Sequence, residues 1–448
     1  MMQRRARGVS VAIALLVVLP VVCAAATHAD IIDGSVIVSR TLDNGAQVVV
    51  KPDHDAPLVA ICAAVRGGSS AERPGERACA HVLEHMIFQR PAQGTPTGLL
   101  PETIEGLGGE VLAATTRDFT RFTVTVATDG FADALAALAQ ALIRPEIDPD
   151  RLSSELKIIQ KELDGIYADP GTALRDAAYA AVYPDGPYSS SPGGGPGKLP
   201  AVAVEQLKSF HARNYVGRDL SLIVVGDVDP TAALDLAASE FAALPPGEDT
   251  LPQPGAAPGA KPGEVAVEGP RGGLVGLAFP APGTSEWKDV LATDVLLSII
   301  DNGDAGRLSV LYPRAAPGAG PAGADFLTQR LPGILVLWGV VGGADEAQAV
   351  NALKGILTDV RDRVPSEEET LRGARGARVI HALSCDTCTG QAETLAFYAA
   401  NATYQRCVEY EHAVLEITPS DVTDVVRRYF DPDKAIVLRE PSERGAGQ

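Results

Sequence analysis

Basic residues are scarce in this chain: 38 lysines and arginines stand against 57 aspartates and glutamates in 448 residues, a formal net charge of −19. Phosphate backbones and anionic headgroups repel such an excess of negative charge, which argues against a nucleic-acid partner and an anionic membrane surface. The same charge suits positively charged or unfolded peptide substrates.

Long apolar runs are absent after residue 29. Before it, three arginines (Arg4, Arg5 and Arg7) precede an apolar stretch over 9–22, and small residues follow as far as Ala29. This order predicts a secretory signal peptide over residues 1–29, cleaved after Ala26 or Ala29. The apolar stretch is too short for a comfortable membrane span. We therefore expect an exported, periplasmic protein without a membrane span. After cleavage it would have 35 basic and 57 acidic residues.

Cysteine is also rare, and five remain after the predicted signal peptide: Cys62, Cys79, Cys385, Cys388 and Cys407. An odd number in an oxidising compartment leaves at least one thiol free or paired to a partner. Cys62 and Cys79 could bridge. The Cys385–Cys388 pair could be a redox motif, a structural disulfide or an accident of sequence, and it lacks the βαβ context of thioredoxin-like motifs.

His81, Glu84 and His85 form an HxxEH motif, the most informative feature of the chain. On a helix, about 100° per residue puts His85 about 40° from His81 and Glu84 about 60° to the other side. Two imidazoles four residues apart can take adjacent corners of a zinc site, with Glu84 beside the ion. Cys79 points away by about 200°, so an open, catalytic-type site is favoured over a closed structural one.

Glu155 and Glu162 offer the third ligand that such a site needs. Seven residues is close to two helical turns, so both carboxylates lie on one face of a helix. Leu156, Ile159 and Leu163 recur at helical spacing and support that helix.

HxxEH followed by this glutamate pair, with Glu162 seventy-seven residues after His85, resembles the pitrilysin, insulinase and mitochondrial processing peptidase family of zinc metallopeptidases. Position by position, the resemblance implies that His81, His85 and Glu162 hold Zn²⁺. It also implies that Glu84 is the catalytic base, which takes a proton from the attacking water, and that Glu155 supports the catalytic site from behind. The reaction it implies is peptide bond hydrolysis by an endopeptidase.

The resemblance covers roughly residues 35–440, and it is specific in the first half and loose in the second. A proline- and glycine-rich linker over 244–263 divides the chain into a zinc-binding domain (30–243) and a domain without a metal site (264–448). Each half has a strand that leads into a helix, first at 58–88 and again at 273–300, a weak duplication of roughly 215 residues. We expect an α+β fold: two similar domains, each a largely antiparallel sheet backed by helices, arranged as half of a clamshell.

The chain departs from the family at two places. Leu112 stands where the family has an asparagine that holds the substrate backbone. An Arg/Tyr pair that stabilises the oxyanion is missing from the segment 306–321, where Arg307 matches the start and Arg314 only approximates the arginine. Because the zinc half is intact and the Arg/Tyr half is not, we predict a hetero-oligomer with a related chain that lacks HxxEH.

Two alternatives stay open: a self-sufficient homodimeric peptidase, and a non-catalytic scaffold subunit of the same family. The enclosed chamber of the paired half-length members would favour short or unfolded peptides as substrates. The remaining histidines (His54, His211, His381 and His412) are scattered without ligand spacing and are expected to be structural or superficial.

Overall fold

The computed structural model describes residues 30–88, 100–249, 251–252, 262–267 and 273–440. The predicted signal peptide and half of the predicted linker lie outside the described residues, so the proposed domain boundaries stay predictions. Within the described ranges, no helix combines the length and apolarity needed to cross a bilayer.

The first sheet has the strand order β1-β2-β6-β3-β5-β4, and only the β2–β6 pair is parallel. Its strands are β1 (Val38–Thr41), β2 (Gln47–Pro52), β3 (Leu58–Val65), β4 (Glu110–Thr115), β5 (Thr120–Ala127) and β6 (Leu220–Gly226). Its half of the chain also contributes α1 (Cys79–Ile87), α2 (Leu100–Gly106), α3 (Phe131–Ile143), α4 (Pro149–Ile166), α5 (Pro170–Val182), α6 (Val204–Asn214) and α7 (Pro230–Glu240).

The second sheet has the order β7-β11-β8-β10-β9, with β7–β11 its parallel pair. Its strands are β7 (Gly263–Ala266), β8 (Leu274–Pro280), β9 (Ala322–Phe326), β10 (Ile334–Val340) and β11 (Ile436–Arg439). The helices of this half are α8 (Trp287–Ile300), α9 (Arg307–Ala315), α10 (Glu346–Asp362), α11 (Glu367–Ser384), α12 (Cys388–Asn401), α13 (Gln405–Ala413) and α14 (Pro419–Tyr429).

The second sheet repeats five strands of the first in the same order. β2 begins at Gln47 and β7 at Gly263, and β6 begins at Leu220 and β11 at Ile436, in both cases 216 residues apart. Two largely antiparallel sheets, each backed by helices, confirm the predicted α+β class and the duplication.

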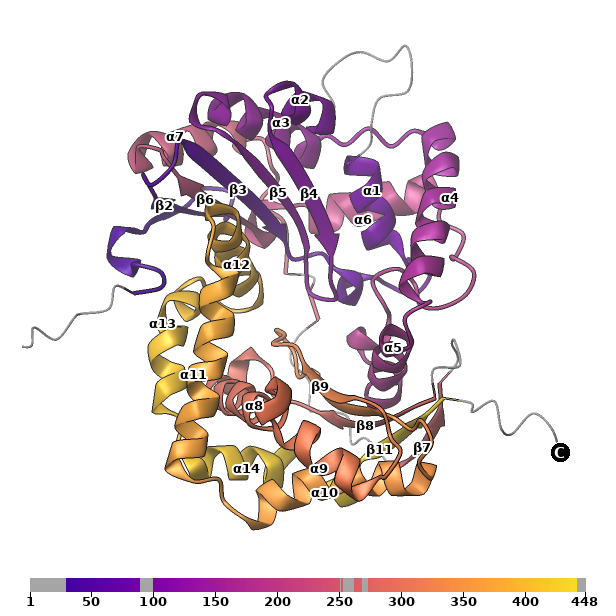
Figure 1. Ribbon diagram of the computed structural model, residues 1–448. Coiled ribbons are helices and arrows are strands. Elements are labelled where there is room, and N and C mark those ends of the chain that lie inside the picture. The colour runs from indigo at the N-terminus through magenta and orange to yellow at the C-terminus, as the bar shows by residue number, and fades with distance from the viewer. Residues whose placement is uncertain (1–29, 89–99, 250, 253–261, 268–272, 441–448) are drawn as a thin grey trace, which may run out of the picture. The chain divides into compact units, whose positions relative to one another are not determined.

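Each sheet is covered in part by a helix from the other half of the chain. α12, from the second half of the chain, packs on β3 and β6, whereas α5, from the first half, packs on β8 and β11 (Figure 1). β3 is buried on both faces from Val59 to Val65, because α12 covers one face and α1 and its neighbours cover the other. This burial explains why the strand reads as a run of small and β-branched apolar residues.

All five cysteines of the described chain are free. A Cys62–Cys79 bridge is wrong, because alternate β3 side chains point to opposite faces. Cys62 belongs to the core beneath α12, and Cys79 to the core on the other face. Cys385 does not pair with Cys388.

Candidate metal centre

Helix α1 carries the HxxEH motif and is anchored at its first turn. Ala78, just before it, has φ of 72° and is the one described non-glycine residue in the left-handed region. The Glu72 carboxylate accepts from the backbone N–H of Ala78 at 3.2 Å and of Ala80 at 3.0 Å. These bonds satisfy amides that a helix start leaves without partners, and they fix α1 in place.

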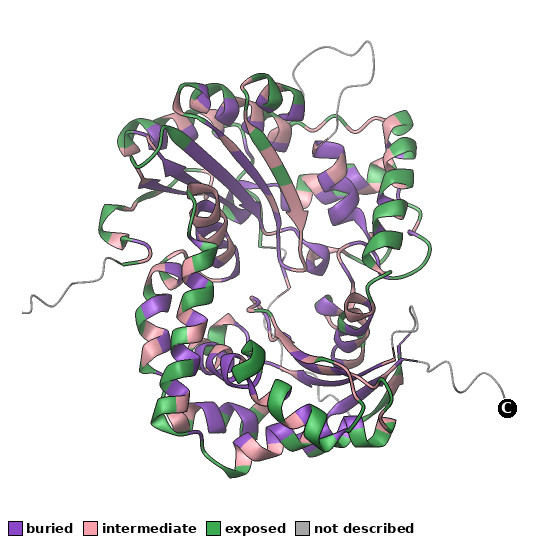
Figure 2. Ribbon diagram, in the orientation of Figure 1, coloured by how far each residue is buried: buried purple, intermediate pink, exposed green. Residues whose placement is uncertain are grey.

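Helix α4 brings the paired glutamates to α1, as predicted. It begins after Asp148, whose side chain accepts from the backbone N–H of Asp150 and Arg151, with Pro149 in its first turn. Its buried face is narrow and most of its surface is exposed, whereas α1 is buried over nearly its whole length (Figure 2). The carboxylates therefore reach α1 from a helix at the protein surface.

The three predicted ligands, His81, His85 and Glu162, converge. Glu162 Oε2 lies 3.2 Å from His85 Nε2, and Glu162 Oε1 lies 3.7 Å from His81 Nε2. The two imidazoles stand edge to face, with ring centroids 4.9 Å apart. Hydrogen bonds from His81 and His85 hold the pKa of the Glu162 carboxyl well below its ordinary value.

The spacing fits a tetrahedral zinc ion. Ligand bonds of 2.0–2.2 Å set the edges of such a tetrahedron at about 3.3–3.5 Å. The 3.2 Å separation of Glu162 Oε2 from His85 Nε2 is close to that length, and one donor atom from each of the three residues lies within 4.8 Å of the others. Two imidazoles and one carboxylate fill three corners and leave the fourth open, the arrangement typical of catalytic sites.

Glu155 lies behind His85, where its Oε2 is 3.4 Å from His85 Nδ1. A carboxylate on the far nitrogen of an imidazole fixes the tautomer and the orientation of the ring. Glu155 can therefore orient His85 so that its Nε2 points to the position a metal ion bound by Glu162 would take.

Glu84 lies beside the three ligands and does not join them. Its carboxylate is 8% exposed and accepts a 2.5 Å hydrogen bond from Thr115 Oγ1 on β4. Burial raises the pKa of the Glu84 carboxyl above its ordinary value, although His81 and Thr115 oppose part of that rise. A buried carboxylate with an elevated pKa is suited to accept a proton near neutral pH.

A cavity of about 350 Å³ opens beside this group. Its lining includes His81, Glu84, Thr115, Glu162, Tyr167 and Arg175. The cavity is bordered by β4, the edge strand of the first sheet, whose outer backbone groups have no strand partner among the described residues. From the sequence, no role was assigned to Thr115, Tyr167 or Arg175. Nothing local marks them, because they reach the cavity from other segments.

The structure shows where the residues at the two departures from the family lie. Leu112 lies on β4 with 48% of its surface exposed and offers no hydrogen-bonding group. Arg307 is engaged by Asp359 at 2.9 Å and by Glu369 at 2.8 Å. Arg314 is exposed on α9, and neither arginine lines the cavity of its own chain.

Two family models match the chain. The insulinase model (peptidase family M16) covers residues 47–193, and the model described as the M16 inactive domain covers 201–316. Zinc protease PqqE of Helicobacter pylori is 23% identical over 416 residues, 90% of this chain and 92% of the relative. The mitochondrial-processing peptidase subunit beta of Blastocladiella emersonii is 25% identical over 206 residues, 46% of this chain and 44% of the relative.

Solved structures with low sequence identity to this chain have a similar fold. The crystal structure of a protease from Helicobacter pylori has a TM-score of 0.79 at 20% identity and covers 90% of this chain and 99% of its own. The two family models together span more than half of the sequence. This chain therefore belongs to the insulinase family of peptidases, M16.

Proposed function

We propose that this chain is the zinc-binding subunit of an exported endopeptidase that hydrolyses short or unfolded peptides. The convergence of His81, His85 and Glu162, with one corner open and Glu84 beside it, carries the proposal. Zinc held there would polarise the scissile carbonyl and acidify the attacking water. Glu84 would accept the proton of that water and pass it to the leaving amine.

Strand β4 gives the substrate a place to lie. An edge strand has unpaired backbone N–H and C=O groups, and an extended peptide can add to it as a further strand. Because Thr115 at the end of β4 is bonded to Glu84, a peptide along this edge would bring a carbonyl to the metal. Only an unfolded or short segment can adopt that extended form.

This chain lacks the Arg/Tyr pair that would stabilise the oxyanion at the positions where the family has it. Arg307 is tied into ion pairs and Arg314 is remote from the cavity. One of the relatives is a subunit by name. We therefore propose that a related chain without HxxEH completes the site in a hetero-oligomer.

Arg175 favours a second candidate, a self-sufficient homodimeric peptidase. It lines the cavity and its side chain is 44% exposed, with Asp325 at 3.6 Å as its ion-pair partner. A guanidinium that is only loosely held can turn toward a developing oxyanion.

The test is hydrolysis of a quenched, unfolded peptide by the zinc-loaded chain, alone and mixed with related chains that lack HxxEH. Glu84→Gln is the control, since it should keep zinc and lose activity. Activity only in the mixture supports the subunit proposal. Activity of the chain alone, lost in Arg175→Ala, supports the homodimer. A chain that binds zinc and shows no hydrolysis in any mixture would be a scaffold, which Leu112 and the missing Arg/Tyr pair would then explain.

A further inference from the structure

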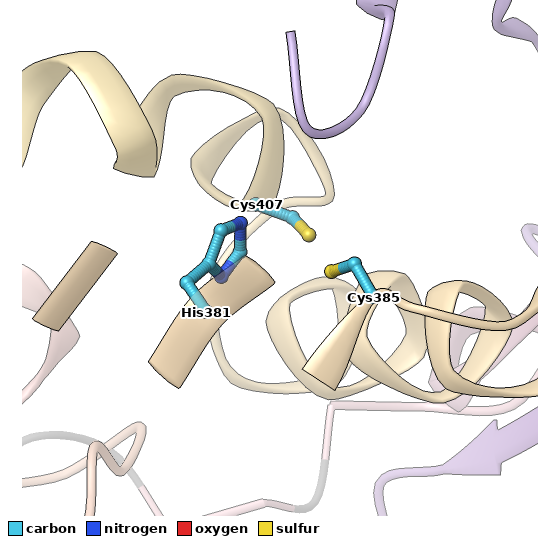
Figure 3. A group of neighbouring side chains, drawn as sticks. All are labelled: His381, Cys385 and Cys407. Atoms are coloured by element: carbon cyan, nitrogen blue, oxygen red, sulfur yellow. The ribbon is translucent and has the colours of Figure 1, made fainter. Parts of the chain in front are cut away.

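A second group of metal-ligating side chains lies far along the sequence from the HxxEH centre. It consists of His381 in the last turn of α11, Cys385 at the end of that helix, and Cys407 in the first turn of α13. One donor atom from each lies within 4.8 Å of the others, and the two sulfurs face each other beside the imidazole (Figure 3). His381 and Cys385 are four residues apart, one in the last turn of α11 and the other the residue that caps its end.

The three side chains are held in a buried setting. His381 is 6% exposed, Cys385 5% and Cys407 0%. The imidazole packs against the ring of Tyr410, with centroids 4.7 Å apart.

We propose that His381, Cys385 and Cys407 form a second, structural zinc site. Zinc takes thiolates at about 2.3 Å and imidazole at about 2.0–2.1 Å, so its ligand atoms stand about 3.5–3.8 Å apart, within the spacing found here. Two thiolates and a neutral imidazole cancel the charge of Zn²⁺, and a site without net charge can be buried at little cost. A water molecule would complete the four ligands, because among the described residues only these three donors lie within 4.8 Å of one another here.

The topology of the group repeats that of the HxxEH centre. There, two ligands four residues apart on α1 meet a third ligand from α4. Here, a residue in the last turn of α11 and the residue that caps this helix, four apart in sequence, meet a third from α13. A disulfide between Cys385 and Cys407 would use only the sulfurs and leave the converging imidazole without a function. A metal ion uses all three donors.

The site would fasten the end of α11 to α13 and thereby fix the short turn into α12. That helix reaches the first sheet: Glu393 accepts from Thr123 at 2.9 Å, and Thr389 is hydrogen-bonded to Thr125 at 2.9 Å. Zinc at His381, Cys385 and Cys407 would therefore help to hold α12 against β5 and β3. This role does not depend on peptidase activity.

Cobalt(II) is the probe, because thiolate-to-cobalt charge transfer gives a near-ultraviolet band and the HxxEH centre has no sulfur ligand. We expect the full chain loaded with Co²⁺ to show this band, and Cys385→Ser and Cys407→Ser each to abolish it. Each variant should also lose about one equivalent of zinc per chain. Cys388→Ser, three residues from Cys385 and outside the group, should keep both band and zinc.

X-ray absorption of the zinc-loaded wild-type chain needs no variant and guards against a serine variant that fails to fold. Sulfur among the zinc ligands would support the proposal. A zinc ligand shell of nitrogen and oxygen alone, or a cobalt band that survives in both serine variants, would overturn it. A Cys385–Cys407 disulfide in the chain as isolated from its exporting host would also overturn it.

Discussion

Thr115 Oγ1 donates a 2.5 Å hydrogen bond to Glu84 Oε2, and this bond links the edge strand β4 to the helix of the HxxEH motif. The same hydroxyl lies 3.1 Å from that of Thr120 on β5. Thr115 therefore joins the edge where a peptide would lie to Glu84, the carboxylate that would accept a proton from the attacking water.

Removal of that hydroxyl should impair the base and spare the metal. Thr115→Val is isosteric, and a hydrogen bond to a charged group contributes about 1.5–3 kcal/mol. We expect kcat to fall about tenfold or more, with zinc content unchanged. Peptide hydrolysis and metal analysis check this, with Thr115→Ser as the control that restores the bond. A serine variant as impaired as the valine variant would contradict it.

Glu155 should act on zinc affinity more than on turnover. Loss of a carboxylate that orients a ligating histidine typically weakens metal binding about 10–100-fold. We therefore expect Glu155→Gln to release zinc to a competing chelator at a correspondingly lower chelator concentration, while kcat at saturating zinc changes little. Asp164→Asn, on the exposed side of α4, is the matched control. Equal zinc affinity in both variants would mean that Glu155 does not orient His85.

Tyr188 joins the first sheet to the second half of the chain. Its hydroxyl donates to Asp118 at 2.5 Å and accepts from the backbone N–H of Leu331 at 2.9 Å, with both side chains buried. Tyr188→Phe should lower the free energy of unfolding by about 1–3 kcal/mol, because a buried carboxyl and a buried amide each lose a partner. Urea denaturation measures this. Tyr404→Phe, at a more exposed hydroxyl, should stay within about 0.5 kcal/mol of the wild type.

Asp294 should make stability fall as the pH rises. Burial raises the pKa of this carboxyl to about 7, although a 2.9 Å hydrogen bond from Tyr410 opposes the rise. The folded chain thus holds a proton that the unfolded chain has lost above its ordinary pKa near 4. The stabilisation is complete below pH 4 and is lost as the pH passes through 7.

Asp294→Asn should lack this component. The difference in urea midpoint between the wild type and the variant should therefore move in favour of the variant between pH 4 and pH 8. Asp304→Asn, at an exposed aspartate, should leave the wild-type profile unchanged. A constant difference across this range would show that Asp294 is ionised throughout.

Local patterns determined the elements that carry the first metal centre. The continuous apolar run of β3 and the helical apolar spacing of α4 depend only on neighbouring residues, so both elements could be predicted. The HxxEH spacing on α1 and the seven-residue spacing on α4 are likewise intrinsic to helix geometry. The duplication could be predicted because both halves repeat the same local signals.

Contacts between distant segments were decided only by the tertiary structure. The exchange of α5 and α12 between the sheets has no periodic signature, because any apolar helix face fits any apolar sheet face. The approach of Cys407 to Cys385, rather than of Cys388, and the entry of Arg175 into the cavity depend on how whole helices pack. Sequence by itself thus determined the candidate ligands of the HxxEH centre, through spacings within single helices, whereas His381 was expected to be structural or superficial. Which helices meet, and so which ligand sets form, was determined by the packing of the core, since that is the level at which residues far apart in the chain first come into contact.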